Sequence, residues 1–377
     1  MLTASQRLLR DLIALPSVNP AFLPNGDPQG GELALAEHVA ATAAKAGLAV
    51  SLDEVLPGRP NVLAVLSPRR RCRSRVLLVP HLDTVGAGDP AAFTPRLRAG
   101  RMHGRGACDT KGSLAAMLSA LTRLAQGPRR PDSTEVVLAG VIDEENHQAG
   151  SRALARAGWK AALAIVGEPT GLRVVTAHKG NLWLQLETSG KAAHGCCPHL
   201  GHNAIRDMAR VVEMLEGPYA EELRRREHPL LGRPTINVGT IHGGVQPNVV
   251  PDACQITVDR RMLPSESEAR VRREIRALLQ TSAVRARLVD LRGVPCPALE
   301  TSPDLPLVRT LLRVARQRGP AGVDYFCDAA VLAAGGIPSV VFGPGSIAQA
   351  HTRDEWIALE QVESATRLLG RFLAGLD

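Results

Sequence analysis

Three apolar segments of the chain end in side chains that bind metal ions or move protons. These side chains are His81 and Asp83 after VLLVP, Asp143, Glu144 and Glu145 after EVVLAGVI, and Glu168 after ALAIVG. In an open α/β sheet, ligands bind beyond the carboxyl ends of the strands, so we expect these groups to converge on one crevice. Each signal is weak by itself, since an H-x-D pair occurs by chance and paired glutamates usually form a solvated face. Their shared position after strands is what indicates a site.

A crowd of acidic groups needs a compensating charge. Four carboxylates beside one imidazole would repel one another at neutral pH unless a cation neutralises them. Between the strands lies a glycine-rich loop, GRGACDTKG (104–112), which opens a helix. Phosphate binding by this loop is disfavoured, because Asp109 would repel an anion and no G-K-[ST] signature is present. The sequence therefore predicts a cation site.

The elements that must position these groups alternate along the chain. Apolar segments typical of buried strands span 61–66, 75–80, 135–142 and 162–166, and helical patterns span 32–46, 114–124 and 149–157. A first amphipathic helix is capped by Thr3 and stopped by Pro16. Strand and helix in alternation predict an α/β fold with a mostly parallel sheet covered on both faces.

The pattern changes after about residue 177. The predicted elements are strands at 181–187, 235–241, 253–262 and 286–291, a helix carrying Ile205, Met208, Val212 and Leu215, and a helix carrying Val271, Ile275 and Leu278 behind a capping box of Ser265 and Glu268. This order is a β-α-β-β-α-β, ferredoxin-like α+β unit. Helix–strand alternation then returns at 305–318, 339–342 and 360–376. We therefore expect a discontinuous metal-binding domain, 1–178 and 292–377, with a second domain inserted at 179–291.

Composition excludes several classes of protein. The 377 residues exceed one ordinary core, and the net charge of +8 comes with only 3% aromatic residues, so a nucleic-acid binder with stacking aromatics is disfavoured. No apolar run approaches the roughly 18 residues of a membrane span, and the N-terminus lacks a signal-peptide core. Seven cysteines without a C-x-x-C pair fit a reducing compartment, for which we expect the cytoplasm. Cys196 and Cys197 are adjacent, which disfavours a disulfide between them.

The motifs of the chain, taken in order, resemble those of one family over nearly the whole length. They are HLDTV (81–85), GRGACDTKG (104–112), DEEN (143–146), GEPT (167–170), AHG (193–195), GGVQPNVVPD (243–252), DRRMLP (259–264) and FGPG…AHTRDE (342–355). This set is similar to that of the M20 metallopeptidases and deacylases, which include acetylornithine deacetylases, succinyl-diaminopimelate desuccinylases and glutamate carboxypeptidases. The resemblance implies a zinc-hydrolase type fold, a mostly parallel sheet flanked by helices, with the insert as a lid and dimerisation domain.

The resemblance also implies two divalent metal ions, zinc first, with cobalt or manganese accepted by the same ligand types. The implied ligands are His81, Asp109, Glu145, Glu168 and His351. Asp109 would bridge both ions. Family members carry a cis peptide after this aspartate, here at Asp109–Thr110.

The catalytic side chains follow from the same resemblance. Two cations roughly 3.5–4 Å apart lower the pKa of a shared water and polarise an amide carbonyl. Glu144 is implied as the general base, which takes the proton of the attacking water and returns it to the leaving amine. Asp83 is implied to accept the other ring N–H of His81 and to fix its tautomer.

Three residues of the insert complete the implied site. In relatives the counterpart of His194 comes from the partner subunit and steadies the developing oxyanion, so we expect a homodimer paired through the inserts. Asn248 and Arg261 match positions that grip the substrate carboxylate, for which a planar guanidinium is suited. The adjacent Arg260 could also be the arginine that matches this family position. The spacing D-x-R-x-x-P favours Arg261.

The leading expectation for function is removal of an acyl group, of acetyl or succinyl type, from the nitrogen of an amino acid. Within the family, glutamate at the position of Glu168 is more frequent in deacylases, and aspartate is more frequent in peptidases. A metallo-carboxypeptidase or dipeptidase is the alternative, so the expected substrates are small N-acyl amino acids or short peptides. A catalytically dead scaffold would be expected to lack a ligand or the base, and none is missing. We expect no nucleic-acid partner and no membrane partner.

Overall fold

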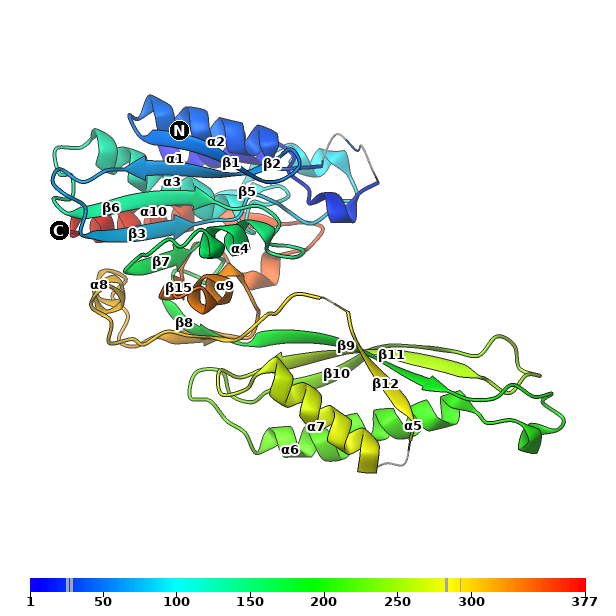
Figure 1. Cartoon of the computed structure of the whole chain (residues 1–377). Coiled ribbons are helices and arrows are strands. Elements are labelled where there is room, and N and C mark those ends of the chain that lie inside the picture. Colours follow the sequence, from blue (N-terminus) through cyan, green and yellow to red (C-terminus); the bar gives the residue numbers. More distant parts are fainter. Residues whose placement is uncertain (25–26, 28–29, 282–283, 292) are drawn as a thin grey trace. The chain divides into compact units, whose positions relative to one another are not determined.

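The computed structural model describes residues 1–24, 27, 30–281, 284–291 and 293–377, and the chain divides into two compact units. Unit 1 comprises Met1–Thr176, Thr301–Ala321 and Cys327–Asp377, and unit 2 comprises Ala177–Glu300 and Gly322–Phe326. Figure 1 shows the path of the chain through both. The insert expected at 179–291 lies inside unit 2, and Gly322–Phe326 is a short segment of unit 2 that the sequence did not indicate.

Unit 1 is built on a sheet whose central strands are parallel, as predicted. Its strands, in spatial order, are β1 (Ala49–Leu56), β2 (Arg59–Leu66), β6 (Thr134–Gly140), β3 (Ser74–Val79), β7 (Leu163–Val166) and β15 (Ser339–Val341). The pairs β6–β3, β3–β7 and β7–β15 are parallel, whereas β1–β2 and β2–β6 are antiparallel. The central strands are apolar because both faces are buried. The sequence did not indicate β1 as a strand, because most of its side chains are exposed and it lacks an apolar run.

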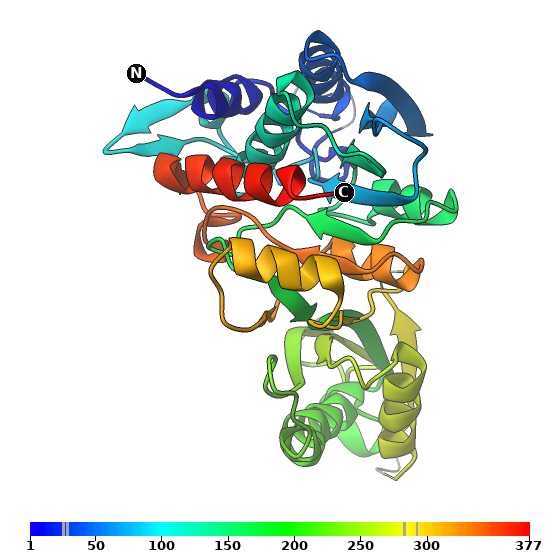
Figure 2. The same ribbon diagram turned by 90° about the vertical axis from the view of Figure 1, so that its left-hand side faces the viewer.

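Helices cover both faces of this sheet (Figures 1 and 2). They are α1 (Ala4–Ile13), α2 (Leu33–Lys45), α3 (Lys111–Gln126), α4 (Ala149–Arg156), α8 (Pro306–Val314), α9 (Asp328–Ala334) and α10 (Leu359–Ala374). Helix α3 is buried along nearly its whole length and packs against α1 and α10. Thr3 caps α1 in a capping box with Gln6, which confirms the predicted start of the first helix.

A small antiparallel sheet in unit 1 consists of β4 (Arg96–Arg98), β5 (Arg101–His103) and β16 (Trp356–Ala358). Three further short strands are β8 (Val175–His178), β13 (Leu299–Glu300) and β14 (Ala321–Val323). Among the described residues, none of the helices is both long enough and apolar enough to cross a membrane.

Unit 2 has the predicted β-α-β-β-α-β order. Its elements are β9 (Gly180–Ser189), α5 (Ala204–Met214), α6 (Ala220–Arg224), β10 (Thr235–Gly243), β11 (Ala253–Met262), α7 (Glu268–Thr281) and β12 (Ala286–Asp290). The strands form one antiparallel sheet in the order β10-β11-β9-β12. Alternate residues such as Leu184 and Ile256 are buried and give the unit an apolar core of its own.

Two local predictions in unit 2 are wrong by one or two residues. Arg270 donates its backbone N–H to Ser267 Oγ at 3.3 Å, so α7 is capped by Ser267 and not by Ser265. Glu268 accepts from the backbone N–H of Cys296 instead of closing a capping box. In α5, Ile205 is exposed and Val211 is buried, so the apolar stripe is rotated slightly from the one predicted.

Candidate metal centre

The ends of three neighbouring strands bring the acidic residues together. His81 follows β3, Glu144 and Glu145 follow β6, and Glu168 follows β7, and these strands are adjacent and parallel. Parallel strands present their carboxyl ends at one edge of the sheet, which is why residues far apart in sequence meet there. His81 Nε2 lies 3.8 Å from Glu168 Oε1.

Asp109 lies between two histidines. Its Oδ1 is 3.0 Å from His81 Nε2, and its Oδ2 is 3.3 Å from His351 Nε2. Asp109 comes just before α3, and the peptide bond that joins it to Thr110 is cis, as expected from the resemblance. The two oxygens of this carboxylate therefore face two different imidazoles.

Glu145 and His351 form the other side of the cluster. The distance from His351 Nε2 to Glu145 Oε2 is 3.0 Å. One ligand atom each from His81, Asp109 and Glu145 lies within 4.8 Å of the other two, a spacing that a metal ion can bridge. All five residues that the sequence marked as ligands thus belong to one group in unit 1.

Asp83 holds the strand ends in place through its carboxylate. It accepts hydrogen bonds from the backbone N–H groups of Glu144 at 3.0 Å and Glu145 at 3.1 Å, and from Asn19 Nδ2 at 2.8 Å. His81 Nδ1 is closer to the Asp83 backbone oxygen, at 3.0 Å, than to the carboxylate, at 3.6 Å. The backbone carbonyl of Asp83 is thus the nearer acceptor for the His81 ring, and the role of the Asp83 carboxylate in fixing the His81 tautomer stays a prediction.

Glu355 is a buried residue whose role the sequence did not reveal. Its carboxylate accepts from the backbone N–H groups of Gly106, Cys108 and Asp109 at 2.8–3.0 Å and pairs with Arg105 at 2.8 Å. The pairing of β16 with β5 brings it there, since His103 and Trp356 are register partners. Glu355 thereby sets the position of the loop that carries Asp109.

Burial raises the pKa values of three carboxyl groups in the cluster. For Glu144 and Glu168 burial is the main cause and repulsion from neighbouring carboxylates adds to it, so both pKa values lie well above their usual range. Burial and the nearby Asp109 raise the pKa of Glu145 to about 6. Without a positive charge among them, these groups are disfavoured as anions.

The pKa values of the two histidines and of Asp109 shift toward the charged form of each group. Hydrogen bonds to Asp109 and Glu145 raise the pKa of His351 to about 10. Burial opposes protonation of His81, but hydrogen bonds to Asp109 and Asp83 outweigh it and raise its pKa. Burial also opposes ionisation of Asp109, yet hydrogen bonds from the two histidines lower its pKa. These groups together thus favour positive charge beside the carboxylates.

Asp328, at the start of α9, is a second residue that the sequence did not assign to the cluster. Its carboxylate accepts a hydrogen bond from Ser151, and burial raises its pKa to about 7. Its charge acts on Glu144 and Glu168. The resemblance implies that YFCD (325–328) replaces a segment that lines the substrate pocket, but it does not mark Asp328 as a metal ligand.

The donor set fits divalent cations. Two imidazoles and three carboxylates are ligand types that Zn²⁺, Co²⁺ and Mn²⁺ accept. Glu168 Oε1 is buried and has no hydrogen-bond partner among the described residues. A buried carboxylate oxygen without a donor is costly, and a cation at this position would satisfy it.

Unit 2 holds the other three residues marked by the sequence. His194 Nδ1 accepts the backbone N–H of Cys196 at 3.2 Å, and the backbone N–H of Gly195 donates to Asn248 O at 2.7 Å, so the loops of His194 and Asn248 are joined. Arg261 is half-exposed on β11 and pairs with Asp259 at 3.0 Å.

The structure distinguishes Arg261 from its neighbour Arg260. Arg260 is fully buried and pairs with Glu266 and Tyr219, so its guanidinium is committed within unit 2. Of the two arginines, Arg261 is the more exposed, and its role in binding a substrate stays a prediction.

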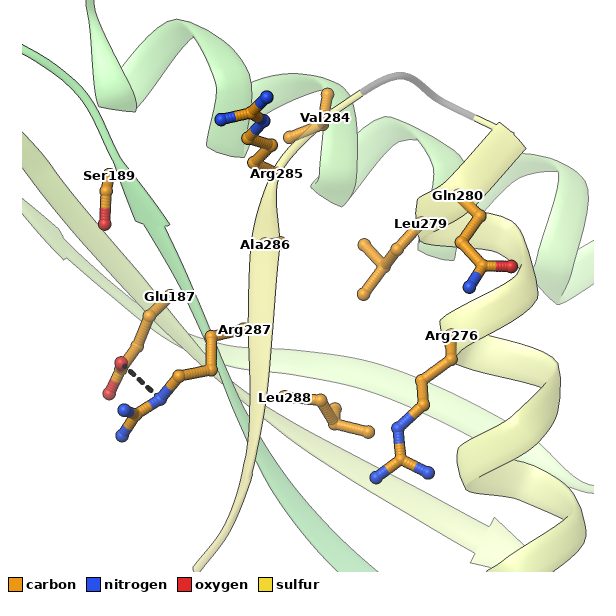
Figure 3. A pocket seen from close by; sticks show the side chains of 10 residues that line it. All are labelled: Glu187, Ser189, Arg276, Leu279, Gln280, Val284, Arg285, Ala286, Arg287 and Leu288. Carbon is orange, nitrogen blue, oxygen red and sulfur yellow. Dashed lines mark ion pairs between the residues drawn. The ribbon is translucent and has the colours of Figure 1, made fainter.

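A cavity of about 940 Å³ in unit 2 has a different character (Figure 3). It lies between α7 and β12, and its polar lining includes Arg276, Arg285 and Arg287, the last paired with Glu187 at 3.3 Å. Arginines dominate the charged lining, and the carboxylate of Glu187 is already paired with Arg287, so the acidic cluster of unit 1 remains the candidate metal site.

Comparison with known proteins identifies the family. Residues 77–375 match peptidase family M20/M25/M40, and the chain belongs to this family, as the resemblance predicted. It is an M20-family hydrolase.

Its relatives and structural neighbours cover nearly the whole chain. An acetylornithine deacetylase of Myxococcus xanthus is 32% identical over 393 aligned positions, which cover 99% of this chain and 97% of the relative. One of Vibrio cholerae is 30% identical over 338 positions, covering 86% of each chain. An M20 family metallo-carboxypeptidase of Sulfolobus solfataricus superposes with a TM-score of 0.78 at 20% identity, over 99% of each chain, and shows the shared fold.

Proposed function

We propose that this protein is a metal-dependent amide hydrolase that removes an acyl group, of acetyl or succinyl type, from the nitrogen of an amino acid. The observation that carries the proposal is the position of Glu144, a half-buried carboxyl group that directly precedes Glu145 of the candidate metal cluster. The names of the most similar relatives support the acyl amino acid as substrate.

The residues that would hold two divalent cations, zinc first, are His81, Asp109, Glu145, Glu168 and His351, with Asp109 in the bridging position. When bound, such cations supply Lewis acidity toward water and a carbonyl oxygen, and the positive charge that keeps the surrounding carboxylates ionised. The two oxygens of Asp109, each facing a different histidine, support the bridging role.

Glu144 serves as the general base in this proposal. It takes a proton from the attacking water and then donates it to the nitrogen of the leaving amine, so that a carboxylate and a free amine result. Asp83 keeps the backbone of Glu144 and Glu145 fixed, and this allows neighbouring side chains to take different roles.

The residues of unit 2 would bind the rest of the substrate. We propose that Arg261 and Asn248 grip the carboxylate of the amino acid, and that His194 stabilises the negative charge that develops on the carbonyl oxygen. His194 would come from a partner subunit, which makes the active enzyme a homodimer. Seven cysteines without a C-x-x-C pair support a reducing, cytoplasmic location.

The test is an activity panel with Glu144→Gln as the matched variant. Protein reconstituted with zinc or cobalt is offered N-acetyl amino acids, N-succinyl amino acids and dipeptides. We expect hydrolysis of an N-acyl amino acid that a chelator abolishes, and a loss of several orders of magnitude in kcat for the variant, whose metal content stays unchanged.

Two results would contradict the proposal. Faster cleavage of dipeptides or C-terminal residues would favour the alternative, a metallo-carboxypeptidase or dipeptidase, and a fully active Glu144→Gln variant would remove Glu144 from its role.

A further inference from the structure

Two adjacent thiols in unit 2 lie on the same side of a turn. The sulfur atoms of Cys196 and Cys197 are 3.6 Å apart, with Cys196 exposed and Cys197 half-buried. Successive side chains of an extended chain point in opposite directions. Here the backbone N–H of Cys197 donates to His194 O at 2.8 Å, and that of Cys196 donates to the His194 ring. These two bonds close the turn and bring both sulfurs together.

The distance between the sulfurs suits a shared ion better than a disulfide. Two sulfurs bound at about 2.3 Å to one tetrahedral ion are about 3.8 Å apart. A disulfide would need the sulfurs at about 2.05 Å, and its Cα atoms are usually about 4.4–6.8 Å apart, whereas adjacent Cα atoms are about 3.8 Å apart, so a disulfide here would be strained. The pair therefore fits a bridging ion without rearrangement of the backbone.

We propose that Cys196 and Cys197 form a binding site for one soft, thiophilic ion, which both sulfurs hold together. Thiolates are the ligands that soft ions select over carboxylates and water. A trivalent arsenical is the sharpest probe, because the carboxylates and imidazoles of unit 1 do not compete for it. With phenylarsine oxide, the two S–H bonds and the arsenic–oxygen bond break, two S–As bonds form, and one water leaves, with arsenic trivalent throughout.

Binding at this site has a consequence for the neighbouring loops. The turn that presents both sulfurs also carries His194, and Gly195 within it is bonded to Asn248. An ion on the two sulfurs would hold this turn in one conformation. The effect on catalysis rests on the proposed function of His194, whereas the binding itself does not.

The test uses the reduced full-length protein, phenylarsine oxide and intact-mass measurement. We expect one phenylarsenic group per chain, which a small dithiol removes and a monothiol does not. Cys196→Ser and Cys197→Ser should each abolish the adduct. Cys72→Ser is the matched control, since Cys72 is also exposed but has no neighbouring cysteine, and it should keep the adduct. Cys→Ser changes are nearly isosteric, and equal thermal unfolding of the variants will verify their folding.

An unlabelled wild-type protein, or a Cys196→Ser variant that retains the adduct, would overturn the site. A second arm measures hydrolysis of the N-acyl substrate with and without the arsenical. We expect at least a tenfold loss in the wild type and none in Cys196→Ser. Full hydrolase activity of a completely labelled protein would refute the effect of the bound arsenical on the His194 turn, but it would not refute the binding site. A protein without hydrolase activity would refute the proposed function, and the mass measurement would still decide the site.

Discussion

Glu355 shows how one buried carboxylate can hold in place the loop that carries a candidate metal ligand, Asp109. It accepts three backbone N–H bonds from the loop and pairs with Arg105. Hydrogen bonds of this kind to a charged group are stronger than neutral ones, and their loss leaves a buried arginine without its counter-charge. The position of Asp109 therefore depends on a residue near the other end of the chain.

We expect Glu355→Gln to lower the free energy of unfolding by about 3 kcal/mol, since breaking a buried ion pair leaves one charge uncompensated. Urea unfolding of the metal-free protein measures this change. Asp354→Asn is the control, because that side chain is 77% exposed, and it should change stability by less than about 0.5 kcal/mol. Equal effects of the two variants would contradict the role of Glu355.

Lys111 predicts a pH dependence of stability. Burial lowers its pKa to about 7 in the folded protein, although its Nζ donates to Leu15 O at 2.7 Å. In the unfolded chain the pKa of this lysine is about 10.4. Between about pH 7 and 10.4 the unfolded state therefore binds more protons than the folded state, and the free energy of unfolding rises with pH. Lys111→Met should remove this rise. Urea unfolding of the metal-free protein from pH 7 to 9.5 measures it, and identical slopes for wild type and variant would refute it.

The meeting of the candidate metal ligands at the strand ends could be predicted from the sequence because their signal is local. His81, Glu145 and Glu168 each follow an apolar strand directly, and parallel strands bring such residues to one edge. Asn19, Asp328 and Glu355 could not be predicted in the same way. Their partners are distant in the sequence, and only the packing of the elements brings them to the strand ends.

At the scale of elements, the start of α7 shows why a capping motif can be misread. Ser265-x-x-Glu268 has the spacing of a capping box, but Glu266 is committed to Arg260 and to the backbone N–H of Leu263. The chain up to Glu266 is therefore held outside the helix, and Ser267 becomes the first residue free to cap it. A tertiary ion pair outweighs the local signal here.

The two serines offer a matched test of this explanation. Ser267→Ala should lower the free energy of unfolding by about 1 kcal/mol, the usual cost of losing an N-cap. Ser265→Ala, at an equally exposed position, should leave it nearly unchanged. Chemical denaturation of both variants measures the difference, and the reverse order would restore the predicted capping box.

At the scale of the whole molecule, the proposed homodimer can be tested by mixing two inactive variants. If His194 acts on the partner subunit, a mixed dimer of Glu144→Gln and His194→Ala subunits contains one complete site. Random exchange should then restore about a quarter of wild-type activity, as expected for a two-fold symmetric pair. Light scattering at the assay concentration should show a dimer. An active monomer, or a mixture without restored activity, would contradict action in trans.

The packing of α10 against α1 and α3 has a consequence for biosynthesis. A ribosome makes α1 and α3 early, and it must then translate all of unit 2 before α10 emerges. Translation adds roughly 5–20 residues per second. The apolar side of α3 therefore stays uncovered by α10 for a time on the order of tens of seconds. A nascent chain stalled before residue 359 should accordingly be bound by chaperones that capture exposed apolar helices, and release of the complete chain should end that association.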